Sequence, residues 1–447
     1  MKEDMKIQTL IFGLLLAMAP SLAQGQALPT AESSMSSALG PNLPNLDGVF
    51  HYALSASEVL QFGYYGNGET TYATNLSANA AYTGRSTARP FSVLFAGGVI
   101  FGNQAGQGTN SFWNIAASQG YVTRNWIFNV SDSFSYLPQS PTTGLSGIPG
   151  VGDLGSTPVQ GPGAGPIGTI LTTSGDRIGN SLTGSVERQI SHNSSISGSG
   201  SWGVLHYLGS NEEGLDTTQV SGVVSLNHRI DARSSVSVSG VYSTFSYGST
   251  SSGVNEPDFQ TRSVNVSYER VLSRTLSVNA TVGPQWISSS NSTLIPDTTN
   301  VSVAAGLSYA YRNWHAGVNY ARGANGGSGV LPGATSNSVA GSAGRNYGRD
   351  WVLGLTASYS RSTGLTQFFT GPSLTSTNET YDTAYGGVQL TRRFSTHFSG
   401  YASYSAASQS FNNSVIVPVT QNILATTYQT IGFGVTFTPR STNLGQF

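Results

Sequence analysis

The chain has 447 residues, of which only 9% are charged, and its formal net charge at pH 7 is -1. An ordinary soluble domain has about 25% charged residues, so a water-facing surface made of Lys, Arg, Asp and Glu is excluded, and the scattered basic residues give no footprint for nucleic acid. The chain has no cysteine, which excludes disulfides, thiol nucleophiles and Cys-based metal sites.

Residues 1–27 are expected to form a signal peptide that is cleaved after export. Lys2 and Lys6 precede an apolar run over 10–19, and small residues at Ala23 and Ala27 offer cleavage sites. A membrane anchor is the weaker alternative, because about ten apolar residues are too few to span a bilayer. Residues 28–51, rich in Pro, Ser and Asn, are expected to be a flexible lead.

From residue 52 to residue 438 apolar and small polar residues alternate, which is the period of a β-strand. We count eighteen strand candidates in this region. The clearest are expected over 72–82, 91–101, 126–136, 220–230, 276–286, 301–311 and 431–437. The connections between them alternate short turns with longer links rich in Gly, Ser, Asn and Pro, and two strands with their connections take about 40 residues, the spacing of repeated hairpins.

Alternating short turns and long loops are typical of an antiparallel transmembrane barrel. Trp126, Trp314 and Trp351 each follow a short turn closely, where an aromatic girdle at the membrane interface is expected. The composition then assigns the faces: the Val, Leu and Tyr face meets lipid, and the Ser, Asn and Thr face lines the lumen. The sequence therefore predicts an all-β fold, a transmembrane up-and-down barrel of 16 to 18 strands, with 18 favoured because both termini must end on the short-turn side.

The last expected strand strengthens this interpretation. Its alternating residues Ile431, Phe433, Val435 and Phe437 resemble the aromatic-ended signal by which outer-membrane barrels are recognised for insertion. The chain thus resembles a porin-like β-barrel of the Gram-negative outer membrane, and is similar to uncharacterised barrels of environmental bacteria. The resemblance implies periplasmic short turns, long outer loops, and both outer-membrane lipid and the barrel assembly machinery as partners. Residues 439–447, ending at Phe447, depart from the pattern and are expected to be a short tail.

Two alternative folds fit the pattern less well than a barrel. A solenoid or adhesin would repeat every 20 to 30 residues or so, and a propeller would need four short strands in each repeat.

Three charged residues fit the barrel pattern badly. Glu58 and Asp132 fall on the apolar face of their strands, and Arg345 lies in a strand of small residues. A bulge or register slip could turn each of these side chains inward.

The sequence offers no pattern for chemistry, so an enzyme is not expected, and neither are catalytic, cofactor or metal residues. The histidines are spread over different hairpins, and three of them, His192, His315 and His397, lie at or beside short turns as polar rim residues. A P-loop and the metalloprotease HExxH motif are both absent. The remaining candidates are therefore residues that line or narrow the lumen.

Four aromatic residues share the parity of the lumen-facing Ser and Thr: Tyr385, Tyr401, Phe245 and Tyr247. Because sugars stack on aromatic faces, as in the sugar-selective porins that this strand count resembles, they are candidate solute contacts. The alternative is that they pack against a loop folded inward. Inward charges are few, with Glu187, Arg229, Glu269 and Arg393 as examples, so strong ion selection is not expected.

The long link over 137–176 is expected to be the third outer loop. Its apolar residues, which include Leu145, Ile148, Val151, Leu154 and Val159, are spaced among prolines, so the loop has reason to pack against something. We expect it to fold inward as a steric constriction, the place that the corresponding loop takes in general porins. An exposed surface loop that contacts a partner is the alternative.

The predicted function is passive diffusion of small hydrophilic solutes, with sugars as one class, through a nearly neutral outer-membrane pore. Two alternatives stay open: a structural or surface-interaction barrel with a closed lumen, and a component of envelope polysaccharide export. The lead of about twenty residues is expected to be too short for the plug of a TonB-dependent receptor.

Overall fold

The computed structural model describes residues 50–62, 70–84, 86, 88–102, 109–137, 177–208, 216–248, 258–328, 331–366, 368–370, 375–377, 380–412 and 427–439. Every regular element within these ranges is a β-strand. No helix among the described residues is long and apolar enough to cross a membrane.

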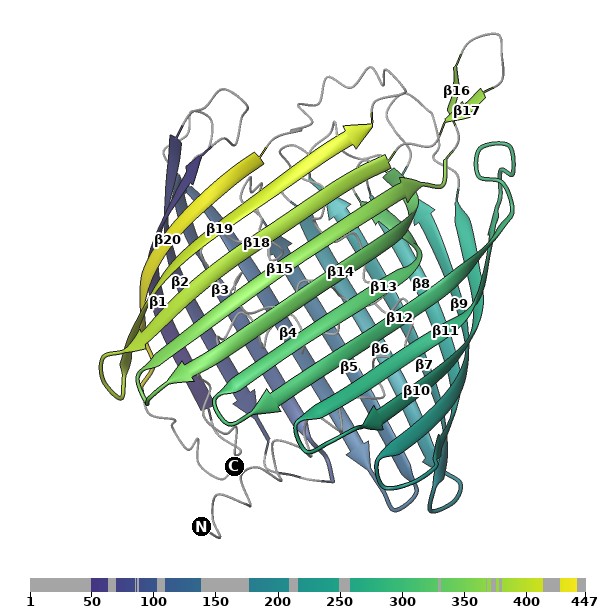
Figure 1. Ribbon diagram of the computed structural model, residues 1–447, viewed down its shortest axis with the longest axis horizontal. Coiled ribbons are helices and arrows are strands. Elements are labelled where there is room, and N and C mark those ends of the chain that lie inside the picture. The colour runs from purple at the N-terminus through teal and green to yellow at the C-terminus, as the bar shows by residue number, and fades with distance from the viewer. Residues whose placement is uncertain are drawn as a thin grey trace.

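Eighteen strands form one closed antiparallel sheet (Figure 1). They are β1 (Phe50–Phe62), β2 (Thr70–Thr83), β3 (Phe91–Gly102), β4 (Thr109–Val122), β5 (Trp126–Leu137), β6 (Arg177–Gln189), β7 (Ser194–Tyr207), β8 (Thr217–Arg229), β9 (Ser234–Tyr247), β10 (Phe259–Val271), β11 (Leu276–Ser289), β12 (Thr298–Tyr311), β13 (Trp314–Ser328), β14 (Leu331–Tyr347), β15 (Trp351–Gly364), β18 (Thr380–Arg393), β19 (Phe398–Asn412) and β20 (Thr427–Phe437). Each pairs with the next in the chain, and β20 pairs with β1, with Phe437 opposite Leu54. The predicted fold class and strand count are confirmed.

A small separate hairpin, β16 (Phe368–Thr370) and β17 (Thr375–Thr377), lies between β15 and β18 outside the barrel sheet. It belongs to one of the long connections, which lie at one end of the barrel, opposite the end where the short turns and both ends of the barrel chain lie (Figure 1). We call these two ends the long-loop end and the short-turn end.

The short turns are closed by local backbone and side-chain geometry. Arg312, in the turn between β12 and β13, has a φ of 51°, and Gly348, between β14 and β15, has a φ of 64°. In the turn between β8 and β9 the carboxylate of Asp231 accepts the backbone N–H of Arg233 at 2.6 Å, and this bond lowers the pKa of Asp231. Because these turns are short and have a defined geometry, they fix the register of the two strands that each one joins.

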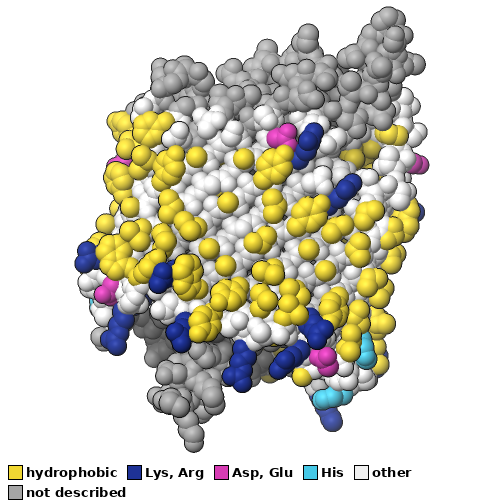
Figure 2. All heavy atoms as spheres, viewed as in Figure 1, with side chains coloured by type: hydrophobic (Ala, Val, Ile, Leu, Met, Phe, Trp, Pro, Cys, Tyr) yellow, Lys and Arg dark blue, Asp and Glu magenta, His cyan; other side chains and the backbone are white. Residues whose placement is uncertain are grey.

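The alternation of side chains gives the two faces opposite character. On β8 the apolar Val220, Val224 and Leu226 are 48–61% exposed on the outside, while Gln219 and Ser221 on the inside are nearly buried. On the face seen in Figure 2, apolar side chains spread over the middle of the wall and the basic side chains gather mainly near one of its edges. An apolar belt on a closed ladder is the surface that lipid requires, so the barrel is a transmembrane one.

Glu58, Asp132 and Arg345 are not turned inward. The ladders that contain these residues run without a bulge at each of them, so the strict alternation of the strand leaves all three on the outer face. Each has a partner there: Glu58 accepts from Thr74 Oγ1 (2.6 Å), and Asp132 accepts from Asn180 Nδ2 (3.2 Å). Local hydrogen bonding, rather than a change of register, accommodates these polar groups.

Candidate functional site

The lumen wall is lined by uncharged hydroxyl and amide groups. The register puts the following small polar side chains on the inward face of β7 to β11: Ser197, Ser199, Ser201, Ser221, Ser225, Ser237, Ser239, Ser243, Thr261, Ser263, Asn265, Asn279, Thr281 and Gln285. Some of these side chains bond across strands: Ser201 Oγ lies 2.5 Å from Ser221 Oγ, and Thr281 Oγ1 donates to Oγ of the inward-facing Ser267 (2.8 Å). These hydroxyl and amide groups offer hydrogen bonds, and the fixed charges on this face lie toward the short-turn end.

Four charged residues share this inward face and lie toward the short-turn end. Glu187 and Glu269 each stand two residues before the end of a strand, and Arg229 and Arg393 are the last residues of theirs. Two carry a negative charge and two a positive one, so their sum is zero. The expectation that the lumen lacks a strong preference for either sign of ion stays a prediction.

At the long-loop end the outer part of β13 separates from β12, while β14 stays paired with β15 as far as Ala334 opposite Gly364. Pairing between β12 and β13 stops at Val303 opposite Arg322, although β12 continues to Thr298 and the β13–β14 ladder continues to Ser328 opposite Leu331. We call residues 323–328 and 331–335 the mouth hairpin. Because β13 is not paired with β12 here, the side of the hairpin that continues the outer face of β13 lies against the inward faces of β9 to β12.

Three hydrogen bonds hold the mouth hairpin against that wall. Tyr247 Oη on β9 donates to the carbonyl oxygen of Gly326 (2.8 Å). The backbone N–H of Ala324 donates to Gln285 Oε1 on β11 (2.9 Å), and Asn300 Nδ2 on β12 donates to Thr335 Oγ1 (3.2 Å). The hairpin thus crosses the inward side of neighbouring strands and narrows the outer mouth of the lumen.

Apolar packing reinforces these bonds. Phe245, Phe259, Ile287, Ile295 and Ala324 form a buried cluster, with Tyr247 and Leu365 packed against it. The rings of Phe245 and Phe259 are stacked, with centroids 4.7 Å apart and planes 16° apart. An apolar cluster inside a polar lumen excludes water from that part of the mouth, so burial as well as hydrogen bonding stabilises the hairpin against the wall.

Two glycines permit the close approach. A Cβ at Gly326 would lie 2.9 Å from Phe245 Cδ1, and one at Gly333 would lie 2.7 Å from Phe259 Cε1. Gly333 also has a φ of 71°, which disfavours other residues. In the sequence, residues 323–332 are one of the longer links rich in Gly and Ser, and their glycine content is the one signal of an inward fold.

The candidate lumen aromatics fall into two groups. Phe245 faces inward and is buried in the cluster beneath the mouth hairpin, and Tyr247 faces inward and packs, partly buried, against that cluster. Tyr385 lies opposite Ala407, six residues from Tyr401 along β19, and this separates the two tyrosines by about 20 Å. Tyr401 lies against Gly434, where a Cβ would be only 2.6 Å from its ring. The four residues do not form one continuous track, and their contact with solutes stays a prediction.

The candidate constriction residues Leu145, Ile148, Val151, Leu154 and Val159 lie outside the described residues, so the inward fold of 137–176 stays a prediction. By the strand order, this segment does connect β5 to β6, which makes it the third connection at the long-loop end.

The three candidate girdle tryptophans share one arrangement. Trp126, Trp314 and Trp351 are each the first residue of a strand, face outward, and lie opposite an arginine of the next strand in the sheet. The guanidinium carbons of Arg188, Arg345 and Arg392 lie 5.1, 4.7 and 5.0 Å from the respective ring centroids. Such cation–π pairs put an aromatic ring and a charge together, which suits a membrane interface.

The candidate assembly residues Ile431, Phe433, Val435 and Phe437 alternate along the outer face of β20, between β19 and β1. The Phe437 ring also contacts Phe398, with centroids 5.0 Å apart. Their role in recognition by the assembly machinery stays a prediction. Within the described ranges no group of three or more His, Asp or Glu side chains could hold a metal ion.

No protein-family model and no curated protein sequence matches the chain. Among solved structures, the barrel is similar to Pseudomonas aeruginosa OccK2 (OpdF) in complex with glucuronate, with a TM-score of 0.43, 10% identity, and coverage of 88% of this chain and 98% of that chain. It is also similar to P. aeruginosa OccK9 (OpdG), with a TM-score of 0.42, 9% identity, and coverage of 89% and 100%. A third similar structure is the FrpB iron transporter of Neisseria meningitidis (F5-1 variant), with a TM-score of 0.44, 7% identity, and coverage of 89% and 66%.

Proposed function

We propose that the protein is an outer-membrane pore for passive diffusion of small, uncharged hydrophilic solutes. The carrying observation is the lining of Ser, Thr, Asn and Gln side chains on the inward faces of β7 to β11, with balanced charges near the short-turn end. Hydroxyl and amide groups exchange hydrogen bonds with a passing solute at little net cost, and they hold it weakly enough to release it. The proposal includes residues 1–27 as a cleaved signal peptide and the short-turn end as the periplasmic one.

The mouth hairpin sets the size limit in this proposal. It occupies the outer mouth on the side of β9 to β12, held by Tyr247, Gln285 and Asn300, and it leaves only the rest of the cross-section for solutes. Because the residues that hold it are uncharged, the narrowing is steric. Discrimination then depends on the size of the solute and not on its charge.

Sugars remain one solute class within this proposal. Tyr401 is the candidate for stacking, since it lies on the inward face against the flat backbone at Gly434. Phe245, by contrast, is 1% exposed beneath the mouth hairpin. Replacing Tyr401 with Ser should weaken block of the ion current by a sugar, while Phe245→Ser should act through the hairpin instead.

Single-channel recording in planar bilayers tests the proposal. We expect discrete openings and, in a tenfold KCl gradient, a reversal potential close to that of a non-selective pore. Strong selection for one ion would contradict the neutral lining, and complete absence of openings would contradict passage itself.

A closed structural barrel is the second candidate, and one observation favours it. Inward-facing Ser243 and Thr261 are 0% and 2% exposed, and Asn265 is 3% exposed, so part of the polar wall is covered. A barrel closed in this way would show no conductance, while its heat-resistant fold would be the same as that of an open pore.

A further inference from the structure

Two arginines stand on the outer face of the barrel near the long-loop end. Arg322 on β13 lies directly opposite Asn337 on β14, and Asn337 lies directly opposite Arg361 on β15. The three residues therefore form a lateral row, with the two arginine Cα atoms two strand spacings apart, or roughly 10 Å. Arginine side chains are long enough to converge on one group over that distance.

The row lies at the opposite edge of the apolar belt from the Trp–Arg pairs. Arg361 is ten residues along β15 from Trp351. At about 3.4 Å per residue and a strand tilt of about 40°, the vertical separation is roughly 25 Å, the usual height of the lipid-facing band. Arg361 is thus at the depth of the headgroups in the leaflet at the long-loop end.

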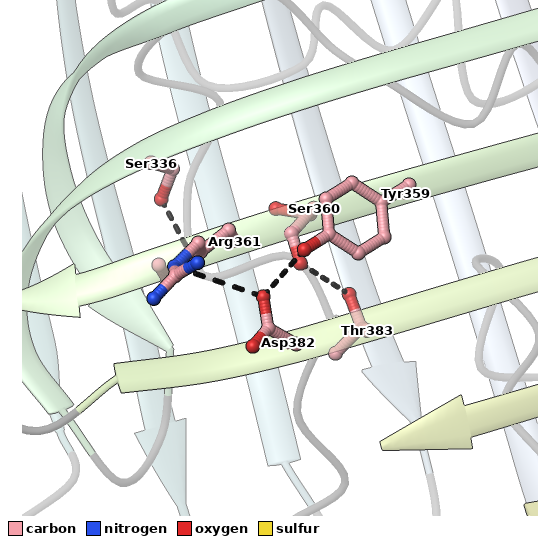
Figure 3. A network of polar contacts seen from close by, with 7 residues as sticks. Ser336, Tyr359, Ser360, Arg361, Asp382 and Thr383 are labelled. Carbon is pink, nitrogen blue, oxygen red and sulfur yellow. Dashed lines mark hydrogen bonds and ion pairs between the residues drawn. The ribbon is translucent and has the colours of Figure 1, made fainter. Parts of the chain in front are cut away.

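The contacts around Arg361 are few, and Figure 3 shows its ion pair with Asp382. Asp382 lies on the far side of Arg361 at 3.9 Å, outside hydrogen-bond distance, and its Oδ1 accepts from Tyr359 Oη at 2.6 Å. The side chain of Arg361 is 57% exposed. Arg322 has no hydrogen-bond or ion-pair partner within the described part of the chain.

Asn337 supplies a third donor between the arginines. Its Oδ1 accepts from Tyr320 Oη at 3.4 Å, which directs the acceptor toward the tyrosine and leaves Nδ2 to donate elsewhere. Two arginines against one carboxylate give the row, with Asp382 included, a net charge of +1. Such a row is complementary to a small anion with several oxygens.

We propose that Arg322, Asn337 and Arg361 bind the phosphate group of a lipid in the leaflet at the long-loop end. Guanidinium groups match phosphate oxygens with paired donors, and the headgroup depth places a lipid phosphate beside them. The outward Tyr320 and Tyr359 flank the row on the membrane side, where rings contact both acyl chains and headgroups. This inference rests on the barrel spanning a membrane and not on what passes through its lumen.

The test measures lipid retained by the purified full-length protein. The protein is reconstituted in phosphatidylcholine vesicles that contain either a phosphorylated glycolipid or the same lipid without phosphate, extracted in detergent, and analysed by native mass spectrometry. We expect the wild type to prefer the phosphorylated form. The double substitution R322Q/R361Q should lower that preference roughly 30-fold, as expected for two basic residues near a lipid surface.

Two further variants make the test independent of folding defects. Asp382→Asn removes the competing carboxylate and should raise retention of the phosphorylated lipid. Arg262→Gln is the matched control: Arg262 also faces outward, on β10, but it lies 5.9 Å from the Tyr242 ring centroid and opposite Trp286, with no arginine in the paired position on β11. It should leave the preference unchanged.

Three results would overturn the proposal. Equal retention of both lipids by the wild type would show that phosphate is not recognised. If millimolar inorganic phosphate stabilised the detergent-solubilised protein as much as the phosphorylated lipid does, the row would bind a free anion and not a lipid headgroup. A change in oligomeric mass in R322Q/R361Q, with unchanged lipid retention, would assign it to contact between two copies of the chain.

Discussion

At the scale of single residues, a polar group on the lipid face loses its hydration, and a single hydrogen-bond partner makes up for only part of that loss. Asp132 faces outward in the middle of β5, between Val130 and Phe134, and its carboxylate accepts one hydrogen bond from Asn180. A single amide does not replace the hydration that a carboxylate loses in lipid. Asp132 is therefore expected to cost stability.

Asp132→Leu should raise the free energy of unfolding by about 1–2 kcal/mol, less than the cost of a basic residue at the same depth. Denaturant titration of the protein refolded in lipid vesicles measures this. Asn180→Ala, which leaves the carboxylate without its donor, should lower stability. If Asp132→Leu is the destabilising change, a polar partner must cover this face in the membrane.

At the scale of elements, the mouth hairpin depends on side chains that reach it from other strands. Tyr247→Phe combined with Gln285→Leu removes two of its hydrogen bonds, each with a net value of about 1 kcal/mol. We expect larger or noisier single-channel conductance. Tyr242→Phe is the matched control, because Tyr242 is on the same strand but faces outward and donates to Gln260. The same change in conductance from Tyr242→Phe would mean that the effect does not come from the hairpin.

The terminal strand makes a second test at this scale. Phe437 is the last aromatic residue of β20 and faces outward against Phe398. Phe437→Ser should lower the amount of protein inserted in the outer membrane, as measured by membrane fractionation, and should leave the conductance of inserted molecules unchanged. Thr436→Ser, on the inward face, is the control. If deletion of Phe447 is damaging and Phe437→Ser is not, the assembly signal lies at the chain end.

The alternation of side chains predicted the strands and their faces, because it depends only on neighbours in the sequence. It did not predict the mouth hairpin, since residues 323–335 are mostly Gly, Ala, Ser and Asn and have no alternating apolar residues. The Trp314–Arg345 pair was also missed, because it depends on the register between β13 and β14.

At the scale of the whole molecule, closure decides resistance to unfolding. The β1–β20 ladder joins the two ends of the sheet, so no strand has a free edge from which the barrel can open. We expect the folded protein to migrate faster on a gel when it is unboiled than when it is boiled. Identical mobility in both states would contradict a closed barrel.

Passage of uncharged solutes is the central claim, and liposome swelling tests it most directly. Liposomes that contain the wild-type protein are placed in isotonic solutions of neutral sugars from three carbons to trisaccharides. The account predicts that the swelling rate is high for the smallest sugar and decreases steeply with sugar size. In the double variant Tyr247→Phe/Gln285→Leu the swelling rate should decrease less steeply with sugar size. Swelling no faster than in protein-free liposomes, for every sugar, would contradict the account and leave a closed barrel.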